Sequence, residues 1–139
     1  MEQKDFLLRE IEKIGSLLKL IFNKIAGKEA NQAKTAENQS EETKGLLLGE
    51  IGFDLDLFLS MKENEMGLYL SGFKGLNVSN IELLADIIKA MGMDAESVIS
   101  RRYLQFALRL YTLCNSLDKT FSFNRENKIN VLNKMLFKR

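Results

Sequence analysis

Residues 3–26, QKDFLLREIEKIGSLLKLIFNKIA, contain the pattern that decides the fold. Leucine and isoleucine recur there at alternating spacings of four and three, at Leu7, Ile11, Ile14, Leu18, Ile21 and Ile25. An α-helix has 3.6 residues per turn, so this spacing places all of them on one stripe. Phe6, Leu17 and Phe22 widen the stripe, and Arg9, Glu12, Lys13, Ser16, Lys19 and Asn23 lie off it. We therefore predict an amphipathic helix over residues 3–26, ended by Gly27.

Composition extends the helical prediction to the whole chain. The 139 residues include 23 leucines, three valines and no proline. Leucine is a strong helix former, whereas β-sheets favour β-branched residues. The length is typical of one domain with a single core, so residues 1–139 are expected to form one helical domain.

The polar segment 28–45, KEANQAKTAENQSEETKG, interrupts the apolar pattern. Its alanines could mark a weak helical face, so we expect either a weakly packed helix or a mobile connection. The segment firms up over residues 46–51, although Gly49 and Gly52 disturb the helical pattern there.

Capping signals divide the second half of the chain. Ser60 with Glu63, and Ser79 with Glu82, each fit a capping box, in which a serine precedes a glutamate by three residues. Asp94 is the predicted cap of a longer helix. Helix ends are expected at the glycines Gly72, Gly75 and Gly92, and a turn is expected over residues 118–122.

Each of these helices has its own apolar stripe. The core-facing residues are predicted to be Met66, Tyr69, Leu70 and Phe73; Ile81, Leu84, Ala85, Ile88 and Met91; Ile99, Tyr103, Phe106, Leu110, Leu113 and Leu117, with Ala107 and Cys114 alongside; and, in a last helix from Phe123, Ile129, Leu132 and Leu136. Short connections favour antiparallel neighbours. The predicted fold is all-α, with about six helices forming antiparallel helical hairpins, either tetratricopeptide-like or as an irregular bundle.

Four stretches carry a resemblance to a known family: residues 4–22, KDFLLREIEKIGSLLKLIF; 52–70, GFDLDLFLSMKENEMGLYL; 81–92, IELLADIIKAMG; and 107–121, ALRLYTLCNSLDKTF. Together they resemble an uncharacterised bacterial family, a domain of unknown function whose members are small helical proteins with tetratricopeptide-like hairpins. The resemblance implies a fold and no activity. True tetratricopeptide repeats differ, because they end in a proline and keep a period of 34 residues.

Residues that carry catalytic chemistry are scarce. Histidine is absent, which removes the commonest general base and metal ligand. Cys114 lies on an apolar stripe, where core packing is favoured over a nucleophilic role. Asp54 and Asp56 fit the start of a helix better than a shared acid–base or metal site. No phosphate-binding loop or zinc-ligand spacing occurs. We predict no catalytic, cofactor-binding or metal-binding residues, no cofactor, and no enzymatic activity.

A protein–protein interaction or scaffolding module is the favoured function. Helical hairpins offer grooves between helices, and the stripe of residues 3–26 could pair with a second copy. The partner prediction is an unknown protein, with a homodimer through Leu7, Ile11, Ile14, Leu18, Ile21 and Ile25 as one form. The competing interpretation is that this stripe covers the core of its own domain.

Binding to an anionic surface is the alternative function. Basic residues gather near Phe121 and Phe123, namely Lys119, Arg125, Lys128, Lys134, Lys138 and Arg139, and Arg101 and Arg102 could extend the patch. A net charge of +1 does not favour nucleic acid as the main partner. The sequence shows no signal peptide and no apolar run long enough for a transmembrane segment, so a cytoplasmic location is expected.

Overall fold

The computed structural model describes residues 2–26, 36–95 and 97–137, and it is helical throughout, with no strand in those ranges. The prediction of an all-α fold is confirmed. Seven α-helices and one π-helical turn follow one another: α1 (Glu2–Ala26), α2 (Ala36–Leu46), η2 (Leu47–Ile51), α3 (Leu55–Leu59), α4 (Glu63–Ser71), α5 (Val78–Asp94), α6 (Ser97–Leu117) and α7 (Phe123–Phe137).

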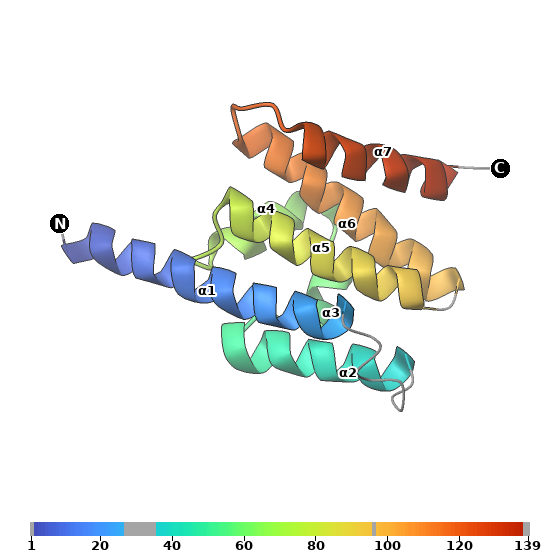
Figure 1. The fold of residues 1–139 in the computed structure, drawn as a ribbon, viewed down its shortest axis with the longest axis horizontal. Helices are drawn as coiled ribbons and strands as arrows, with labels where there is room; N and C mark the ends of the chain where they lie inside the picture. The colour runs from blue at the N-terminus through green and yellow to red at the C-terminus, as the bar shows by residue number, and fades with distance from the viewer. Residues whose placement is uncertain (1, 27–35, 96, 138–139) are drawn as a thin grey trace.

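Helix α5 lies in the middle of the molecule (Figure 1). Helix α1 runs beside it in the same direction, and α6 returns antiparallel behind it. Helix α7 packs antiparallel on α6, and α2 packs antiparallel on the other side of α1. The N-terminal end of α1 extends past the other helices. Consecutive antiparallel packing agrees with the predicted hairpins, assembled as a bundle.

Helix α1 begins within one residue of its predicted start, and the C-terminal part of its stripe is core. Ile14, Leu18, Ile21 and Ile25 are buried, whereas Leu7 is exposed and Ile11 is partly buried. The stripe therefore serves the domain's own core from Ile14 onward. The predicted terminator, Gly27, lies outside the described residues.

The hairpin of α5 and α6 contributes about half of the buried apolar residues in the described ranges. The predicted stripe of α5 is buried throughout, and so are Tyr103, Phe106 and Leu110 of α6. Ile99 and Leu117, at the two ends of α6, are exposed, so the prediction was wrong for them. They lie in the first and last turns of the long helix, beyond the reach of its neighbours.

An aromatic cluster joins the short helices α3 and α4 to α6. Phe53 packs with its ring centroid 5.1 Å from that of Phe58 and 5.6 Å from that of Tyr69, and Phe58 meets Phe106 of α6 edge-on at 5.6 Å. Such tilted and edge-on pairs are the favoured aromatic geometry. The Tyr69 hydroxyl also accepts a hydrogen bond from the Asp54 amide at 3.0 Å, which fixes the start of α3.

The predicted capping boxes were wrong in position. Helix α4 begins after Lys62, whose amide donates to the Glu65 carboxylate at 2.8 Å. Helix α5 is capped by Asn77, whose side chain accepts from the Asn80 amide at 3.0 Å. Asparagine is as favourable an N-cap as serine, and Asn77 precedes the predicted cap, Ser79, by two residues.

Two further predicted boundaries were wrong in the α5–α6 hairpin. Asp94 is the last residue of α5 and does not cap α6. Gly92 lies within α5 and does not end it. A Cβ at this position would come 3.0 Å from the Cβ of Tyr103 on α6. The glycine lets α6 approach α5 closely, which is a packing role that resembles a helix stop in the sequence.

The structure describes residues 36–45 of the polar segment. Residues 36–46 form α2, and the π-helical turn η2 follows it and ends at Gly52 with a positive φ of 84°. Thr43 and Leu47 are buried against α1 and its neighbours, while the other residues from 38 to 46 are exposed or only partly buried. The expectation of a weakly packed helix is confirmed from residue 36, and residues 28–35 lie outside the described part.

Gly75 lies where the turn before α5 touches α1. A Cβ at Gly75 would come 2.7 Å from the Glu10 carbonyl oxygen and 2.5 Å from Cδ1 of Ile14. The buried amide of Asn80 seals the same contact, because its Nδ2 donates to the carbonyls of Ile11 at 2.9 Å and Gly75 at 2.6 Å. This junction sets how closely α1 can approach α5.

Replacing Gly75 by alanine should destabilise the fold by about 2 kcal/mol, because the added methyl group meets backbone that cannot move aside. Gly67→Ala is the matched control. Its methyl group would meet nothing within 4 Å on the exposed face of α4, and it should stabilise by roughly 0.5–1 kcal/mol. Urea unfolding of both variants measures the difference. Equal effects would contradict the close contact.

Candidate functional site: a groove between α1, α5 and α7

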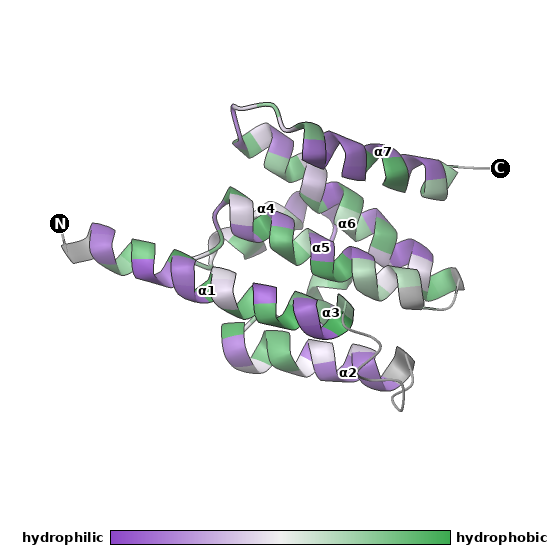
Figure 2. Cartoon of the chain, viewed as in Figure 1, coloured by the Kyte–Doolittle hydropathy of each residue, from purple (hydrophilic) through white to green (hydrophobic). Residues whose placement is uncertain are grey.

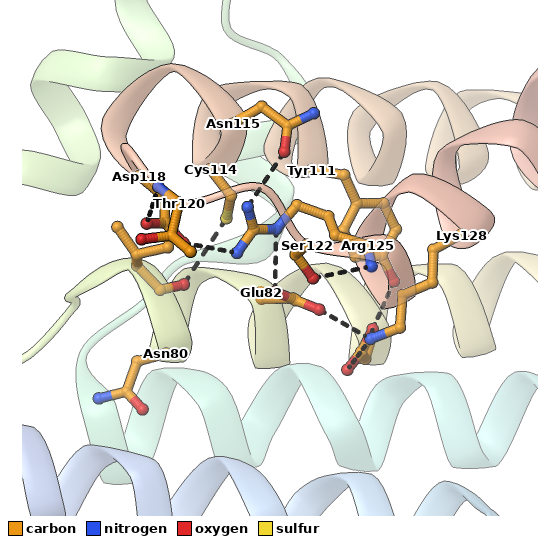
Figure 3. Close-up of polar contacts among 12 residues, drawn as sticks. Asn80, Glu82, Tyr111, Cys114, Asn115, Asp118, Thr120, Ser122, Arg125 and Lys128 are labelled. Atoms are coloured by element: carbon orange, nitrogen blue, oxygen red, sulfur yellow. Dashed lines mark hydrogen bonds and ion pairs between the residues drawn. The ribbon is translucent and has the colours of Figure 1, made fainter.

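A buried guanidinium holds α7 against the rest of the molecule (Figure 3). Arg125 is only 4% exposed, and its three nitrogens donate to Glu82 at 3.0 Å, Asn115 at 3.0 Å and Asp118 at 3.3 Å. These partners belong to α5, to α6 and to the turn after α6. One side chain of α7 is therefore bonded to both helices of the central hairpin.

Lys128, one turn further along α7, completes the network. Its ammonium group lies 2.9 Å from Glu82 and 3.0 Å from Asp86, which are one turn apart on α5. The hydroxyl of Tyr111 on α6 donates to the Asp86 carboxylate as well. Two carboxylates of α5 thus meet two cations of α7, with the tyrosine as a further donor.

The network shifts the pKa values of Glu82, Lys128 and Tyr111. Burial alone would raise the pKa of the Glu82 carboxyl, but hydrogen bonds from Lys128 and Arg125 outweigh it and hold the pKa below its usual value. Burial would likewise lower the pKa of Lys128, and its bonds to Glu82 and Asp86 raise it instead. Burial, then the Asp86 charge, raises the pKa of Tyr111. Glu82 and Lys128 therefore stay ionised near neutral pH, and Tyr111 stays protonated.

This charge network is saturated. No buried side-chain nitrogen or oxygen in the described ranges lacks a hydrogen-bond partner. Both cations of the network, Arg125 and Lys128, are paired with carboxylates, so the network acts as a clamp between helices. The clamp matters for binding because Asp86 and Lys128 also border an open groove.

The groove lies between the C-terminal end of α1, the second half of α5, and α7. It has a volume of about 580 Å³ and its lining is mainly apolar. Helix α5 forms the floor with a single stripe at spacings of three, four and seven residues after Asp86. The lining residues are Phe22, Ile25 and Ala26 from α1, Asp86, Lys89, Ala90 and Met93 from α5, and Lys128 from α7.

Two exposed apolar side chains of α7 lie on the same side of that helix as Lys128. They are Val131 and Met135, three and seven residues after it, and neither belongs to the groove lining. On the groove floor, Met93 is 53% exposed. The groove is therefore open, with uncovered apolar surface on its floor.

Lys89 provides a cation on the groove floor. It makes no ion pair with any residue that the structure describes, in contrast to Lys128. Asp86 is already occupied by Lys128 and Tyr111. The electrostatic character of the open part of the groove is therefore positive.

Cys114 and the acidic pair lie away from the groove. Cys114 is fully buried, its thiol donates to the Val78 carbonyl at 3.6 Å, and burial raises its pKa to about 12. The prediction of a core cysteine is confirmed. Asp54 caps α3 by accepting from the Leu57 amide at 3.1 Å, and Asp56 pairs with Lys44 at 3.1 Å. The predicted helix-start role of Asp54 is confirmed, and the two carboxylates have separate partners.

The basic cluster predicted near the C-terminus is divided by the fold. Arg125 and Lys128 are neutralised in the charge network, whereas Lys119 and Lys134 are exposed. Lys138 and Arg139 lie outside the described residues. Phe121 and Phe123 are exposed and pack edge-on against each other at 4.7 Å.

The remaining members of the predicted basic patch also have internal partners. Arg101 donates to the Leu136 carbonyl at 2.7 Å, and Arg102 donates to the Leu59 carbonyl at 3.1 Å. The guanidinium of Arg102 also lies 6.0 Å from the ring centroid of Phe106. Both arginines therefore satisfy helix-end carbonyls and fix neighbouring helices in place.

Comparison with known proteins finds no matching family model, no matching curated protein and no matching solved structure. The resemblance noted in the sequence therefore stands only as a small, all-helical protein. Within the described ranges, no group of three or more acidic or cysteine side chains could hold a metal ion. None of the helices described is both long enough and apolar enough to cross a bilayer.

Sequence reasoning missed the groove and the charge network. The sequence pattern predicts Glu82 as part of a capping box. The spacings within Glu82 and Asp86, and within Arg125 and Lys128, also indicate two charged helix faces of opposite sign. Two carboxylates four residues apart and two cations three residues apart each share one helix face. That these faces meet depends on the packing of α7, which the pattern does not specify.

We expect Cys114 to be unreactive in the folded protein, because its thiol is buried and remains protonated below about pH 11. With an aromatic disulfide reagent at pH 8, labelling of the native chain should be at least ~100-fold slower than labelling in urea. Prompt labelling under native conditions would show that α6 does not pack as described.

Glu82→Gln should destabilise the fold by about 2–3 kcal/mol near neutral pH, because it removes the shared partner of Arg125 and Lys128. The folded-state pKa of Glu82 is lowered, so its stabilisation is complete above the ordinary value of 4.5 and is lost as the pH falls through the folded-state value.

The free-energy gap between wild type and Glu82→Gln should therefore narrow as the pH falls below about 4.5. Urea unfolding at a series of pH values measures it. Glu50→Gln, an exposed position outside the network, is the control and should change stability by less than about 0.5 kcal/mol. A gap that is constant with pH would contradict the ionised network.

Proposed function

We propose that this chain is a non-enzymatic, cytoplasmic protein-interaction module, and that the groove between α1, α5 and α7 is its binding surface. The observation that supports the proposal is a mainly apolar lining, contributed by α1 and α5 beside Lys128 of α7 and concentrated at one place. A contiguous exposed apolar patch on a small domain often marks an interaction site, whereas single exposed apolar residues do not.

An α-helix is the occupant that the groove favours. The groove is bounded by helices, and a further helix laid along α5 would bury Ala90 and Met93 as in an ordinary bundle. A small molecule needs a site that encloses most of its surface. The exposure of Met93 shows that the floor is too open to enclose one.

Charge narrows the chemistry of that helix. The ammonium of Lys89, which has no ion-pair partner among residues 2–26, 36–95 and 97–137, lies among apolar residues, so its best partner is an acidic side chain beside an apolar stripe. The occupant is therefore an amphipathic helix whose apolar stripe is flanked by aspartate or glutamate. A basic helix would place like charges together at Lys89 and Lys128.

The anionic-surface alternative has less support. Its central cations, Arg125 and Lys128, have carboxylate partners, so binding a phosphate there would first require breaking the clamp. Counterion release needs several cations free to face phosphates. No specific arrangement of the described residues favours this second function.

A photo-reactive amino acid at Met93, in the groove, tests the interaction surface. In an extract of the native cell, illumination should give a discrete adduct from position 93. The same group at Leu68, which is exposed on α4 and does not belong to the groove lining, should give none. Lys89→Glu should abolish the adduct by repelling the acidic side chain.

Equal cross-linking from positions 93 and 68 would indicate non-specific contact. Absence of any adduct from position 93, in extract and in concentrated pure protein, would overturn the groove as a binding surface. An adduct that survives Lys89→Glu would overturn the acidic partner and retain the surface.

A further inference from the structure

The projecting end of α1 is an apolar surface that the domain does not cover (Figure 2). Leu7 and Leu8, near the N-terminal end of α1 that extends past the other helices, are 41% and 50% exposed. Phe6 is 52% exposed, and the ammonium group of Lys74, in the turn before α5, lies 5.9 Å from its ring centroid. The chain thus carries both an uncovered groove for a helix and an uncovered helix end.

A second stripe of α1, next to the core stripe, connects these two features. It consists of Leu8, Glu12, Lys19 and Asn23, which follow one another at spacings of four, seven and four residues, and all four are exposed. Ala26, three residues after Asn23, continues the stripe into the groove lining. We call these four residues the outer stripe.

The charges of the outer stripe are complementary to themselves. Glu12 and Lys19 lie at equal distances from the point between Gly15 and Ser16. If two α1 helices pack antiparallel about that point, each Glu12 faces the other copy's Lys19. Neither side chain makes an ion pair with the residues described in its own chain, so both are available for this contact.

The same antiparallel pairing brings the projecting end to the groove. Leu8 of one copy then lies opposite Asn23 of the other, within one turn of the groove residues Phe22 and Ala26. The twofold symmetry makes the contact reciprocal, so both projecting ends and both grooves are used at once. A closed dimer results, and no surface is left to start a filament.

We propose that the helix in the groove is the projecting N-terminal end of α1 from a second copy of this chain. The inference rests on the proposed function and names its partner. Asp5 and Glu12 flank Leu8 on one side of α1, at three residues before and four after. Lys4, four residues before Leu8, lies on the other side. The projecting end therefore has one acidic flank, formed by Asp5 and Glu12, which is the chemistry that Lys89 favours.

The outer stripe differs from the stripe that the sequence suggested for a homodimer. Ile14, Leu18, Ile21 and Ile25 are consumed by the domain's own core, so a dimer built on them would have to unfold the domain. The outer stripe is accessible in the folded domain, and substitutions there should leave the fold intact.

Sedimentation velocity of the full-length chain over about 1–200 µM tests the proposal. The wild type should pass from monomer to dimer in this range. Leu8→Glu should raise the dimer dissociation constant at least about tenfold, since it places a charge in an apolar contact. Leu68→Glu, equally polar and exposed on α4, should sediment as the wild type does. Circular dichroism checks that each variant is folded.

A charge exchange identifies the antiparallel pairing. Glu12→Lys alone should weaken the dimer about tenfold, because at each of the two symmetric sites the introduced positive charge then faces Lys19 of the opposite copy. The double variant Glu12→Lys with Lys19→Glu should restore the dissociation constant to within about threefold of the wild type. A folded double variant that remains as weak as the single variant would overturn the pairing.

The outcomes separate this inference from the proposed function. A wild type that stays monomeric at 200 µM, or one whose dimer ignores Leu8→Glu, overturns the second copy as occupant. If position 93 still gives an adduct with another protein, the groove keeps its function with a different acidic helix. If position 93 gives no adduct either, both fall together.

Discussion

The ion pairs between α5 and α7 determine the shape of the rest of the molecule. Glu82 and Asp86 lie in the first half of α5, so the cations Arg125 and Lys128 draw α7 onto that half alone. Beyond Lys128, α7 packs on α6, and the second half of α5 packs on α1 and α6 and leaves one side open to solvent. The groove is the space that this one-sided clamp leaves.

A clamp of charges differs in its consequences from an apolar contact at the same place. Buried ion pairs contribute little net free energy, because desolvation offsets their attraction, but a misplaced charge among them is costly. Arg125 finds acceptors on α5, on α6 and in the turn after α6 only when α7 has one register. Apolar side chains would tolerate sliding. The network therefore fixes the side of α7 that borders the groove at Lys128.

The sequence predicted what depends on local periodicity and missed what depends on how helices meet. The stripe of Leu18 and Ile21 identified the buried face of α1 because burial follows the helical repeat. Gly92 was misjudged because a glycine that admits a neighbouring helix resembles one that ends its own. Glu82 was assigned to a cap because its partners are more than forty residues away. The groove has no local signature, since its lining comes from three separate helices.

The groove and the projecting end of α1 explain each other, since each is an incomplete packing surface that the other would complete. Hydrogen–deuterium exchange of the full-length chain at about 1 and 200 µM tests this most directly. Exchange should slow with concentration in three segments, the amides of residues 4–12, 19–26 and 86–93, where a docked helix would suppress fraying and opening. Exchange in all three segments that does not change with concentration would contradict the account.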